Sequence, residues 1–311
     1  MPKVLISDSL SNLANEVFEK NNIEVDTKIN LSSEELKKII NNYEGLVVRS
    51  ATKATDDIIS AGTKLKIIGR AGAGVDNIDL ISAKKNNVIV MNTPGGNTNA
   101  TAEHTLSLLM SLYRSIPEAN TGTHKNLWEK KKFNGLELKG KNLGIIGFGN
   151  VGVRFSEMAI ALGMKVSVYS ESFLSRQKDY PNIASKSLSD LITESDVITF
   201  HCKPPKDGKS LISMDHLKLM KKNAVLINTA RGGLINENDL KKALDEGLIR
   251  GAAIDVFTEE PAKNNVLFGT KNLILTPHIA ASTVEAQLVV AEQIAIQISD
   301  YFNKGEVINS V

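Results

Sequence analysis

Three side chains capable of acid–base and anion chemistry follow apolar, β-branched segments of the chain. Arg231 follows 224–228, Glu260 follows 251–256, and His278 comes soon after the next such segment. Parallel α/β sheets bind ligands at the carboxyl ends of their strands. A histidine can take a proton from an alcohol near pH 7. A glutamate on its other ring nitrogen would fix its tautomer, and a guanidinium can hold a carboxylate with paired hydrogen bonds. The trio therefore predicts oxidation of a 2-hydroxy acid, although a surface location for the arginine remains an alternative.

A glycine-rich turn supplies a second chemical signal. An apolar segment, 143–147, leads into Gly147-Phe148-Gly149-Asn150-Val151-Gly152, and a predicted helix and strand follow. The first glycine permits the tight turn, the second admits a pyrophosphate, and the third allows the helix to pack closely on the strand. The helix N-terminus adds N–H donors for phosphates. This context predicts a dinucleotide site, with a glycine turn that binds no ligand as the alternative.

The second strand of this unit, 165–169, leaves the choice of nucleotide open. An NAD site usually has an acidic residue at the strand end, where Ser170 stands in this chain. Glu171 could bind the ribose hydroxyls and favour NAD, or it could be a solvated loop carboxylate. Alternatively, Ser170, Ser172 and Arg176 could accept the 2′-phosphate of NADP. We expect NAD and keep NADP as the alternative.

The elements that position these residues are short apolar segments alternating with helical patterns. Segments that are apolar throughout are typical of parallel strands buried on both faces. The predicted strands are 4–8, 45–49, 66–70, 88–92, 143–147, 165–169, 196–201, 224–228, 251–256 and 273–276. This pattern predicts an α/β protein with two Rossmann-like, doubly wound parallel sheets.

Two predicted helices could connect the domains. One spans 99–112, and the other follows Ser282, where Ser282 or Thr283 could cap an apolar stripe ending at Phe302. If the second helix packs on the N-terminal strands, the substrate-binding domain comprises residues 1–96 and 282–311. The dinucleotide-binding domain is then 97–281.

Composition excludes several function classes. The net charge of +2, from 37 basic and 35 acidic residues, argues against a nucleic-acid or membrane-surface partner. The single cysteine allows neither an internal disulfide nor a thiolate metal cluster, and we expect no metal. The sequence has neither a signal-peptide pattern nor an apolar run near the roughly 20 residues that span a bilayer. A reducing cytoplasm fits these features.

The chain resembles the D-isomer-specific 2-hydroxy-acid dehydrogenases over essentially its whole length. Arg231, Glu260 and His278 fall on the family's arginine, glutamate and histidine with the family's spacing. The other matching segments are Val48–Lys53, Gly69–Asn77, Asn92–Pro94, the glycine turn, Asn228–Gly233, Asp255–Pro261 and Pro277–Thr283. The resemblance implies two similar α/β domains with the site in the cleft, which is expected to close on the substrate.

The resemblance also implies roles for further residues. Those expected at the substrate are Arg49, Ser50, Gly72, Ala73, Gly74, Asn97, Lys130, Arg231 and His278. Those expected at the cofactor are Gly147, Gly149, Asn150, Val151, Gly152, Ser170, Glu171, Cys202, Thr229, Ala230, Arg231, Asp255, His278, Ala280 and Ala281. Arg49 suits a substrate phosphate, with a strand-end salt bridge as the alternative. Lys130 is expected to reach the partner's site in a homodimer.

The activity implied is oxidation of 3-phosphoglycerate to 3-phosphohydroxypyruvate, which begins serine synthesis. One alternative is a glyoxylate or hydroxypyruvate reductase, with NADPH as its alternative coenzyme, and another is a corepressor that senses the cofactor. Ser170, Ala73 and the 201–205 loop depart from the family pattern and bear on the cofactor contacts. Because the sequence stops at Val311, a regulatory amino-acid-binding domain is not expected.

Overall fold

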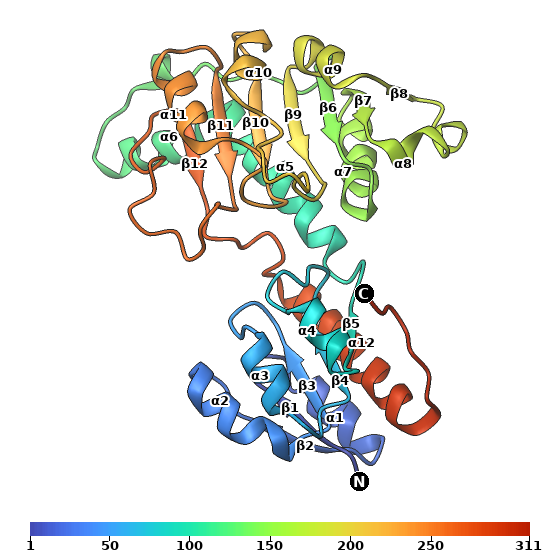
Figure 1. The fold of residues 1–311 in the computed structure, drawn as a ribbon. Helices are drawn as coiled ribbons and strands as arrows, with labels where there is room; N and C mark the ends of the chain where they lie inside the picture. Colours follow the sequence, from blue (N-terminus) through green and yellow to red (C-terminus); the bar gives the residue numbers. More distant parts are fainter. The chain divides into compact units, whose positions relative to one another are not determined.

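The computed structural model describes all 311 residues and divides them into two compact units (Figure 1). The first comprises Met1–Asn97 and Ser282–Val311, and the second comprises Thr98–Ala281. The boundary near residue 97 lies one residue later than the sequence predicts. The first unit is therefore built from both ends of the chain.

A five-stranded parallel sheet with strand order β2-β1-β3-β4-β5 forms the centre of the first unit. Its strands are β1 (Lys3–Ile6), β2 (Glu24–Thr27), β3 (Gly45–Val48), β4 (Ile67–Arg70) and β5 (Ile89–Asn92). The connecting elements are α1 (Leu13–Lys20), α2 (Ser33–Ile39), η1 (Ile40–Asn42), α3 (Asp56–Ala61) and α4 (Leu80–Lys85). Because the strand order reverses at β1, a crevice for ligands is expected where β1 and β3 end.

The C-terminal helix α12 (Val284–Lys304) completes the first unit. The Thr283 hydroxyl accepts a hydrogen bond from the Ala286 N–H at 3.1 Å, so Thr283 is the cap. The helix packs on β4, where a Cβ added at Gly69 would lie 2.5 Å from Ile298 Cδ1. The helix thus packs on an N-terminal strand, which is the condition under which the sequence predicts a discontinuous first domain.

A seven-stranded parallel sheet with strand order β12-β11-β10-β9-β6-β7-β8 forms the second unit. Its strands are β6 (Asn142–Ile146), β7 (Lys165–Tyr169), β8 (Ile183–Ser185), β9 (Val197–Phe200), β10 (Val225–Asn228), β11 (Gly251–Ile254) and β12 (Leu273–Leu275). The helices are α5 (Thr98–Arg114), α6 (Ile116–His124), α7 (Asn150–Ala161), α8 (Glu171–Leu174), α9 (Leu188–Glu194), α10 (Met214–Leu219) and α11 (Glu237–Asp245), with 3-10 turns η2 (Lys130–Lys132) and η3 (Gln177–Asp179). The strand order reverses between β6 and β9, which places the switch point at the glycine turn. None of the helices is long and apolar enough to cross a membrane.

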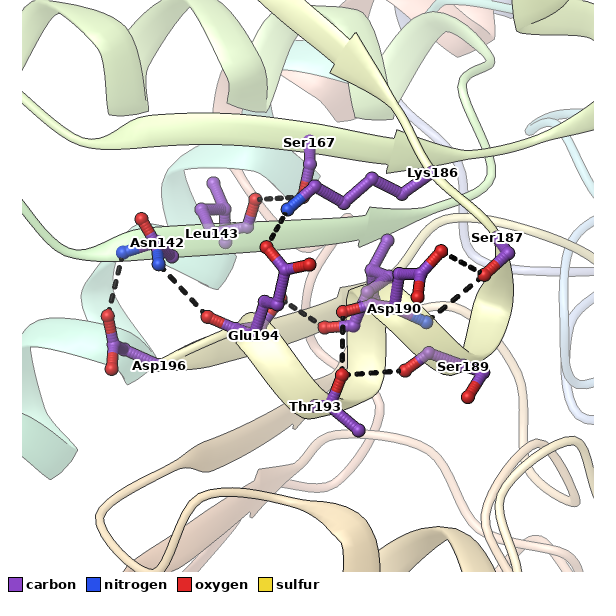
Figure 2. Close-up of polar contacts among 12 residues, drawn as sticks. Asn142, Leu143, Ser167, Lys186, Ser187, Ser189, Asp190, Thr193, Glu194 and Asp196 are labelled. Atoms are coloured by element: carbon purple, nitrogen blue, oxygen red, sulfur yellow. Dashed lines mark hydrogen bonds and ion pairs between the residues drawn. The ribbon is translucent and has the colours of Figure 1, made fainter.

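Polar contacts fix the amino-terminal end of β6 (Figure 2). The Asn142 N–H donates to Asp196 Oδ2 at 2.8 Å, and the Asn142 amide donates to the Glu194 carbonyl at 3.0 Å. Lys186 forms an ion pair with Glu194. The Ser187 hydroxyl caps α9 by accepting the Asp190 N–H at 3.1 Å. These contacts tie α9 to the strand that leads into the glycine turn.

All ten predicted strands are present, with ends that differ by one or two residues. Sequence reasoning missed β2 and β8, which both lie at an edge of their sheet. The β2 sequence, Glu24-Val25-Asp26-Thr27, is half-exposed and carries two carboxylates. These two edge strands include polar residues and exposed positions, so they lack the continuous apolar pattern on which the prediction depended, whereas the edge strands β5 and β12 are mostly apolar and were predicted.

Candidate active site

The glycine turn has the close approaches that a dinucleotide cradle requires. Gly147 has φ +92°, and a Cβ there would lie 2.5 Å from the His201 carbonyl oxygen. A Cβ at Gly152 would lie 2.5 Å from the Gly147 carbonyl oxygen. By contrast, a Cβ at Gly149, which immediately precedes α7, would meet no atom within 4 Å. The turn is packed tightly from behind and open at Gly149, so these residues fit a pyrophosphate.

Aromatic side chains support the turn from behind. Phe148 is buried and meets Phe173 and Tyr180 edge-on, with ring centroids 4.8 and 5.0 Å away. In the loop after β9, Cys202 lies against Gly147, and burial raises the pKa of its thiol to about 11. The thiol is therefore neutral near pH 7 and lines the turn as a small apolar group.

The end of β7 carries hydroxyl groups. The Ser170 and Ser172 hydroxyl oxygens are 3.0 Å apart. Glu171, which lies between them, is exposed and has no hydrogen bond or ion pair in the structure. The structure therefore shows no contact of Glu171 that favours either ribose binding or a solvated loop carboxylate.

His278 and Glu260 form a directly bonded pair. His278 Nδ1 lies 2.6 Å from Glu260 Oε2, and Glu260 Oε1 accepts the Phe257 N–H at 2.9 Å. Burial alone would raise the pKa of the Glu260 carboxyl, but the hydrogen bonds from His278 and Phe257 hold this pKa below its usual value. Since an ionised carboxylate only accepts, the proton on this side of the ring lies on Nδ1 and leaves Nε2 as the acceptor.

Asp255, which is fully buried, holds the turn that carries His278. Its carboxylate accepts the Thr276 hydroxyl at 2.6 Å and the Ile279 and Ala280 N–H groups, each at 2.9 Å. The Asp255 carbonyl accepts the His278 N–H at 2.8 Å. His278 itself has φ +54°, a left-handed conformation that a non-glycine residue adopts only when its surroundings hold it.

Sequence reasoning did not identify His104 as a partner of this network. His104 Nε2 lies 3.3 Å from the Thr276 hydroxyl and 3.4 Å from Asp255 Oδ1. Burial would raise the pKa of Asp255, but the contacts with His104, Thr276 and the backbone lower it. The sequence shows only that His104 lies in an apolar helix, because its partners Thr276 and Asp255 lie far along the chain.

Arg231 follows β10, the strand next to β11. The Asn228 side chain pins its turn, donating to the Arg231 carbonyl at 2.8 Å and accepting the Ala230 N–H at 3.1 Å. A Cβ at Gly232 would lie 1.8 Å from the Phe257 carbonyl oxygen, so the turn packs directly on the loop that leads to Glu260. The Thr229 hydroxyl, also buried, lies 2.8 Å from the Thr105 hydroxyl. The trio thus follows three neighbouring strands, β10, β11 and β12, and histidine and glutamate are in hydrogen-bond contact.

The expected substrate residues Arg49, Ser50, Gly72, Ala73, Gly74 and Asn97 all lie in the first unit. Arg49 is half-buried where β3 ends, beside a pocket of about 530 Å³ that also involves Ser9, Ser11 and the start of α12. Its side chain donates one hydrogen bond, to the Ser9 carbonyl at 3.0 Å, and forms no ion pair, so the salt-bridge alternative is not supported. Burial lowers the pKa of Arg49, partly offset by Asp8.

The loops around Arg49 are fixed by side chains that sequence reasoning missed. Asp8 accepts the Arg49 N–H at 2.6 Å, and the Asn77 amide donates to the Arg49 carbonyl at 2.7 Å. Like Arg49, Arg70 lies at the carboxyl end of a strand, because it is the last residue of β4, which pairs with β3. Its guanidinium lies against Gly72. A basic residue at each of two neighbouring strand ends is the signal that could have identified Arg70.

Other predicted residues are more dispersed. Lys130 is exposed in η2, and its side chain forms no hydrogen bond or ion pair. The exposed Trp128, with 85% of its surface accessible, precedes it. Asn150 and Val151 begin α7 at the glycine turn, and Ala280 is buried beside Asp255. Ala281 is half-buried at the end of the second unit.

Comparison with known proteins agrees with this geometry. Residues 106–280 match the family model described as D-isomer specific 2-hydroxyacid dehydrogenase, NAD binding domain. A D-3-phosphoglycerate dehydrogenase of Synechocystis sp. is 43% identical over 96% of this chain and 54% of its own length. The chain therefore spans about half the length of the curated relatives it matches.

Two solved structures extend the comparison to the whole chain. The NAD+-bound 3-phosphoglycerate dehydrogenase of Entamoeba histolytica is 31% identical, with a TM-score of 0.84 covering 100% of this chain and 98% of the other. An acyclic imino acid reductase (Bsp5) in complex with NADPH and D-Arg is 29% identical, with a TM-score of 0.88 and 99% of each chain covered. The chain belongs to the D-isomer specific 2-hydroxyacid dehydrogenase family.

Proposed function

We propose that this protein oxidises a 2-hydroxy acid with NAD, and that its substrate is 3-phosphoglycerate. The observation that carries the reaction class is the 2.6 Å contact between His278 and Glu260, at the same sheet edge as the glycine turn. The names of the relatives support the choice of substrate. With that activity, the product is 3-phosphohydroxypyruvate and the setting is serine synthesis in the cytoplasm.

In the proposed chemistry His278 is the general base. The C2 hydroxyl proton passes to Nε2 as the oxygen forms a carbonyl, and the hydride leaves C2. Glu260 keeps the proton on Nδ1 and stabilises the imidazolium that forms. Arg231 would hold the substrate carboxylate and polarise the C2 oxygen. In the reverse direction the imidazolium returns its proton to the oxygen.

The cofactor would lie along the glycine turn. Gly147, Gly149, Asn150, Val151 and Gly152 would hold its pyrophosphate. When bound, its nicotinamide supplies the acceptor for the hydride. Thr229, Ala230, Asp255, Ala280 and Ala281 would line the nicotinamide end, while Ser170, Glu171 and Cys202 would line the adenosine end.

Arg49 supports a phosphorylated substrate. Its guanidinium is half-buried, is bonded to one neutral carbonyl, and faces a pocket in the first unit. A partly desolvated cation without a carboxylate partner is best satisfied by an anion. Ser50, Gly72, Ala73, Gly74 and Asn97 would complete this part of the substrate site. Glyoxylate and hydroxypyruvate carry one anionic group, the carboxylate assigned to Arg231, so a reductase of either would leave a second anion site at Arg49 unused.

Two variants test the proposal. His278→Gln should reduce turnover at least 100-fold, within the contribution of a general base, while leaving cofactor affinity nearly unchanged. Arg49→Ala should lower kcat/KM for 3-phosphoglycerate roughly 10- to 100-fold, since a hydrogen bond to a charged group is lost. Lys53→Ala, a cation in the same loop, is the matched control and should have little effect.

Comparison of substrates separates the two enzyme hypotheses. The Arg49→Ala variant should barely alter the reduction of glyoxylate, which has no phosphate. An equal loss on both substrates would reject phosphate recognition, and unchanged turnover in His278→Gln would reject the assignment of the base.

We propose further that the protein is a homodimer. Helix α6 has no buried residue, and Ile116, Leu127 and Trp128 expose 52, 48 and 85% of their surfaces. A helix and loop with this much apolar exposure require a covering partner. Lys130 lies in the same segment and would reach the partner's substrate. Trp128→Glu should convert a dimer in analytical ultracentrifugation to a monomer, and a dimer that persists would place the interface elsewhere.

A further inference from the structure

The backbone at Phe257 and Thr258 lies against the supports of two members of the trio. The Phe257 N–H donates to Glu260 Oε1 at 2.9 Å, while the other oxygen of this carboxylate contacts His278. A Cβ at Gly232 would lie 1.8 Å from the Phe257 carbonyl oxygen, so the turn that carries the catalytic arginine packs on the same backbone. A shift of this backbone would therefore move Glu260 relative to the histidine.

A second carboxylate, Glu237, holds the next backbone donor. Glu237 is the first residue of α11 and is half-buried. Its Oε1 accepts the Thr258 N–H at 2.8 Å, and its Oε2 accepts the Asn265 side-chain amide, also at 2.8 Å. Two consecutive backbone N–H groups thus donate to two different carboxylates, one carried by the loop itself and one on α11.

The two contacts of Glu237 close the neck of the loop that carries Glu260. Residues 258–264 of this loop are mostly exposed, so burial contributes little to their position. On the far side of the neck, the Asn265 Oδ1 accepts the N–H of the buried Leu267 at 2.9 Å. Because Glu237 bonds both sides of the neck, it ties the start of the loop to this buried end.

Stability of the helix does not account for these contacts. Glu237 lies in the first turn of α11, where a negative charge favours a helix through its dipole, but that effect needs no partner in the loop. The helix already has a cap, because the Asn236 side chain accepts the Asp239 N–H at 3.0 Å. The contacts with Thr258 and Asn265 therefore identify the loop as the element that Glu237 supports.

We propose that Glu237 is a positioning residue for the reaction, which holds the backbone at Thr258 and thereby keeps Glu260 in contact with His278. The inference rests on the proposed function, in which those last two residues are the acid–base pair. Glu237 acts through the backbone and is not itself a catalytic group. A displacement of about 1 Å at a reacting group can cost about 100-fold in rate, so loosening this loop has a measurable effect.

Steady-state kinetics of Glu237→Ala with 3-phosphoglycerate test this role. The variant should lower kcat about tenfold, as a small misplacement would, while the calorimetric affinity for NAD stays within about threefold. Glu237→Gln keeps one acceptor oxygen and should recover part of kcat. Glu34→Ala removes an exposed first-turn carboxylate of α2 and is the matched control, with kcat unchanged. Circular dichroism checks that each variant is folded.

A double-mutant cycle separates positioning from general stabilisation. If Glu237 acts through Glu260, adding Glu237→Ala to Glu260→Gln should lower kcat by no more than about threefold, because the contact that it supports is already weakened. The full tenfold loss in that background would show that the two residues act independently, and it would overturn the proposal.

Hydrogen exchange tests the contact itself without activity. The Thr258 amide should exchange at least about tenfold faster in Glu237→Ala than in the wild-type protein. Equal exchange overturns the proposal, and so does faster exchange with an unchanged kcat, which would mean that Glu237 only ties the loop. If the wild-type protein turns over no 2-hydroxy acid, the proposed function fails and the positioning role is rejected with it, whereas the exchange result still decides whether Glu237 holds the loop.

Discussion

Replacing Asp255 with asparagine should separate the support of the His278 turn from the chemistry of the histidine. The aspartate is fully buried and accepts three side-chain or backbone donors within 2.9 Å. Asparagine has nearly the same shape but only one acceptor oxygen. Whichever way the amide is turned, its NH2 group must face at least one N–H or hydroxyl donor.

The cost of this substitution can be worked from these contacts. If the amide oxygen keeps Thr276 and Ile279, the Ala280 N–H loses a charged acceptor, which costs about 1.5–3 kcal/mol. The Ala280 N–H is buried, so leaving it without a partner costs about 1–3 kcal/mol, and the two estimates overlap. We expect Asp255→Asn to lower the free energy of unfolding by about 2–4 kcal/mol at pH 7.

The pH dependence has a definite sign. The pKa of Asp255 is lower in the folded protein than in the unfolded chain, so its stabilisation is complete above about pH 4 and is lost as the pH falls through the folded value. The wild-type advantage over Asp255→Asn should therefore be constant between pH 5 and 7 and shrink in more acidic solution.

Urea denaturation followed by far-ultraviolet circular dichroism measures this difference at each pH. Asp215→Asn, at an exposed carboxylate in α10, is the matched control and should change stability by less than about 0.5 kcal/mol. A loss below about 0.5 kcal/mol in Asp255→Asn, or a loss that stays the same down to pH 3, would refute the reasoning.

The remaining predictions concern the His278–Glu260 pair and the glycine turn. Glu260→Gln removes the charge that His278 contacts at 2.6 Å, so turnover should fall about tenfold or more while calorimetric cofactor affinity stays within threefold; unchanged turnover would contradict this role. Gly152→Ala, whose Cβ would lie 2.5 Å from the Gly147 carbonyl oxygen, should lower the melting temperature and weaken the cofactor at least tenfold. Gly149→Ala meets no protein atom, so it should weaken the cofactor without lowering the melting temperature, and loss of stability in this variant would show that its turn was misjudged.

The sequence predicted those parts of the fold whose signals are local. Parallel strands buried on both faces are apolar throughout, so β3, with the sequence Gly-Leu-Val-Val and all four residues buried, is visible without any knowledge of its neighbours. The glycine spacing is local in the same sense, because one short turn contains all three glycines, with Gly147 and Gly152 closely packed and Gly149 open. The edge strands β2 and β8 have no such signal, since each includes exposed positions.

The candidate site could be predicted only as a set of strand ends. Arg231, Glu260 and His278 each follow an apolar segment, and parallel pairing of β10, β11 and β12 brings those ends to one edge. What holds the side chains depends on strand register. Asp255 reaches the 276–280 turn because Ile254 lies opposite Leu275, and a shift of one residue would remove that reach. The periodicity of apolar residues in the sequence does not show which residues of neighbouring strands lie opposite each other.

In each of the two units, a buried aspartate that follows a strand holds the loop that carries a candidate site residue. Asp8, two residues after β1, is 6% exposed and accepts the Arg49 N–H, the Thr52 N–H and the Thr52 hydroxyl. Asp255, directly after β11, does the same for the turn of His278. A carboxylate has two acceptor oxygens and no donor, so one buried aspartate can hold several N–H and O–H groups of a loop, whereas an amide or a hydroxyl has only one acceptor oxygen. An aspartate just after an apolar strand therefore marks the loop to be held, and the loop held in this way carries Arg49 in one unit and His278 in the other.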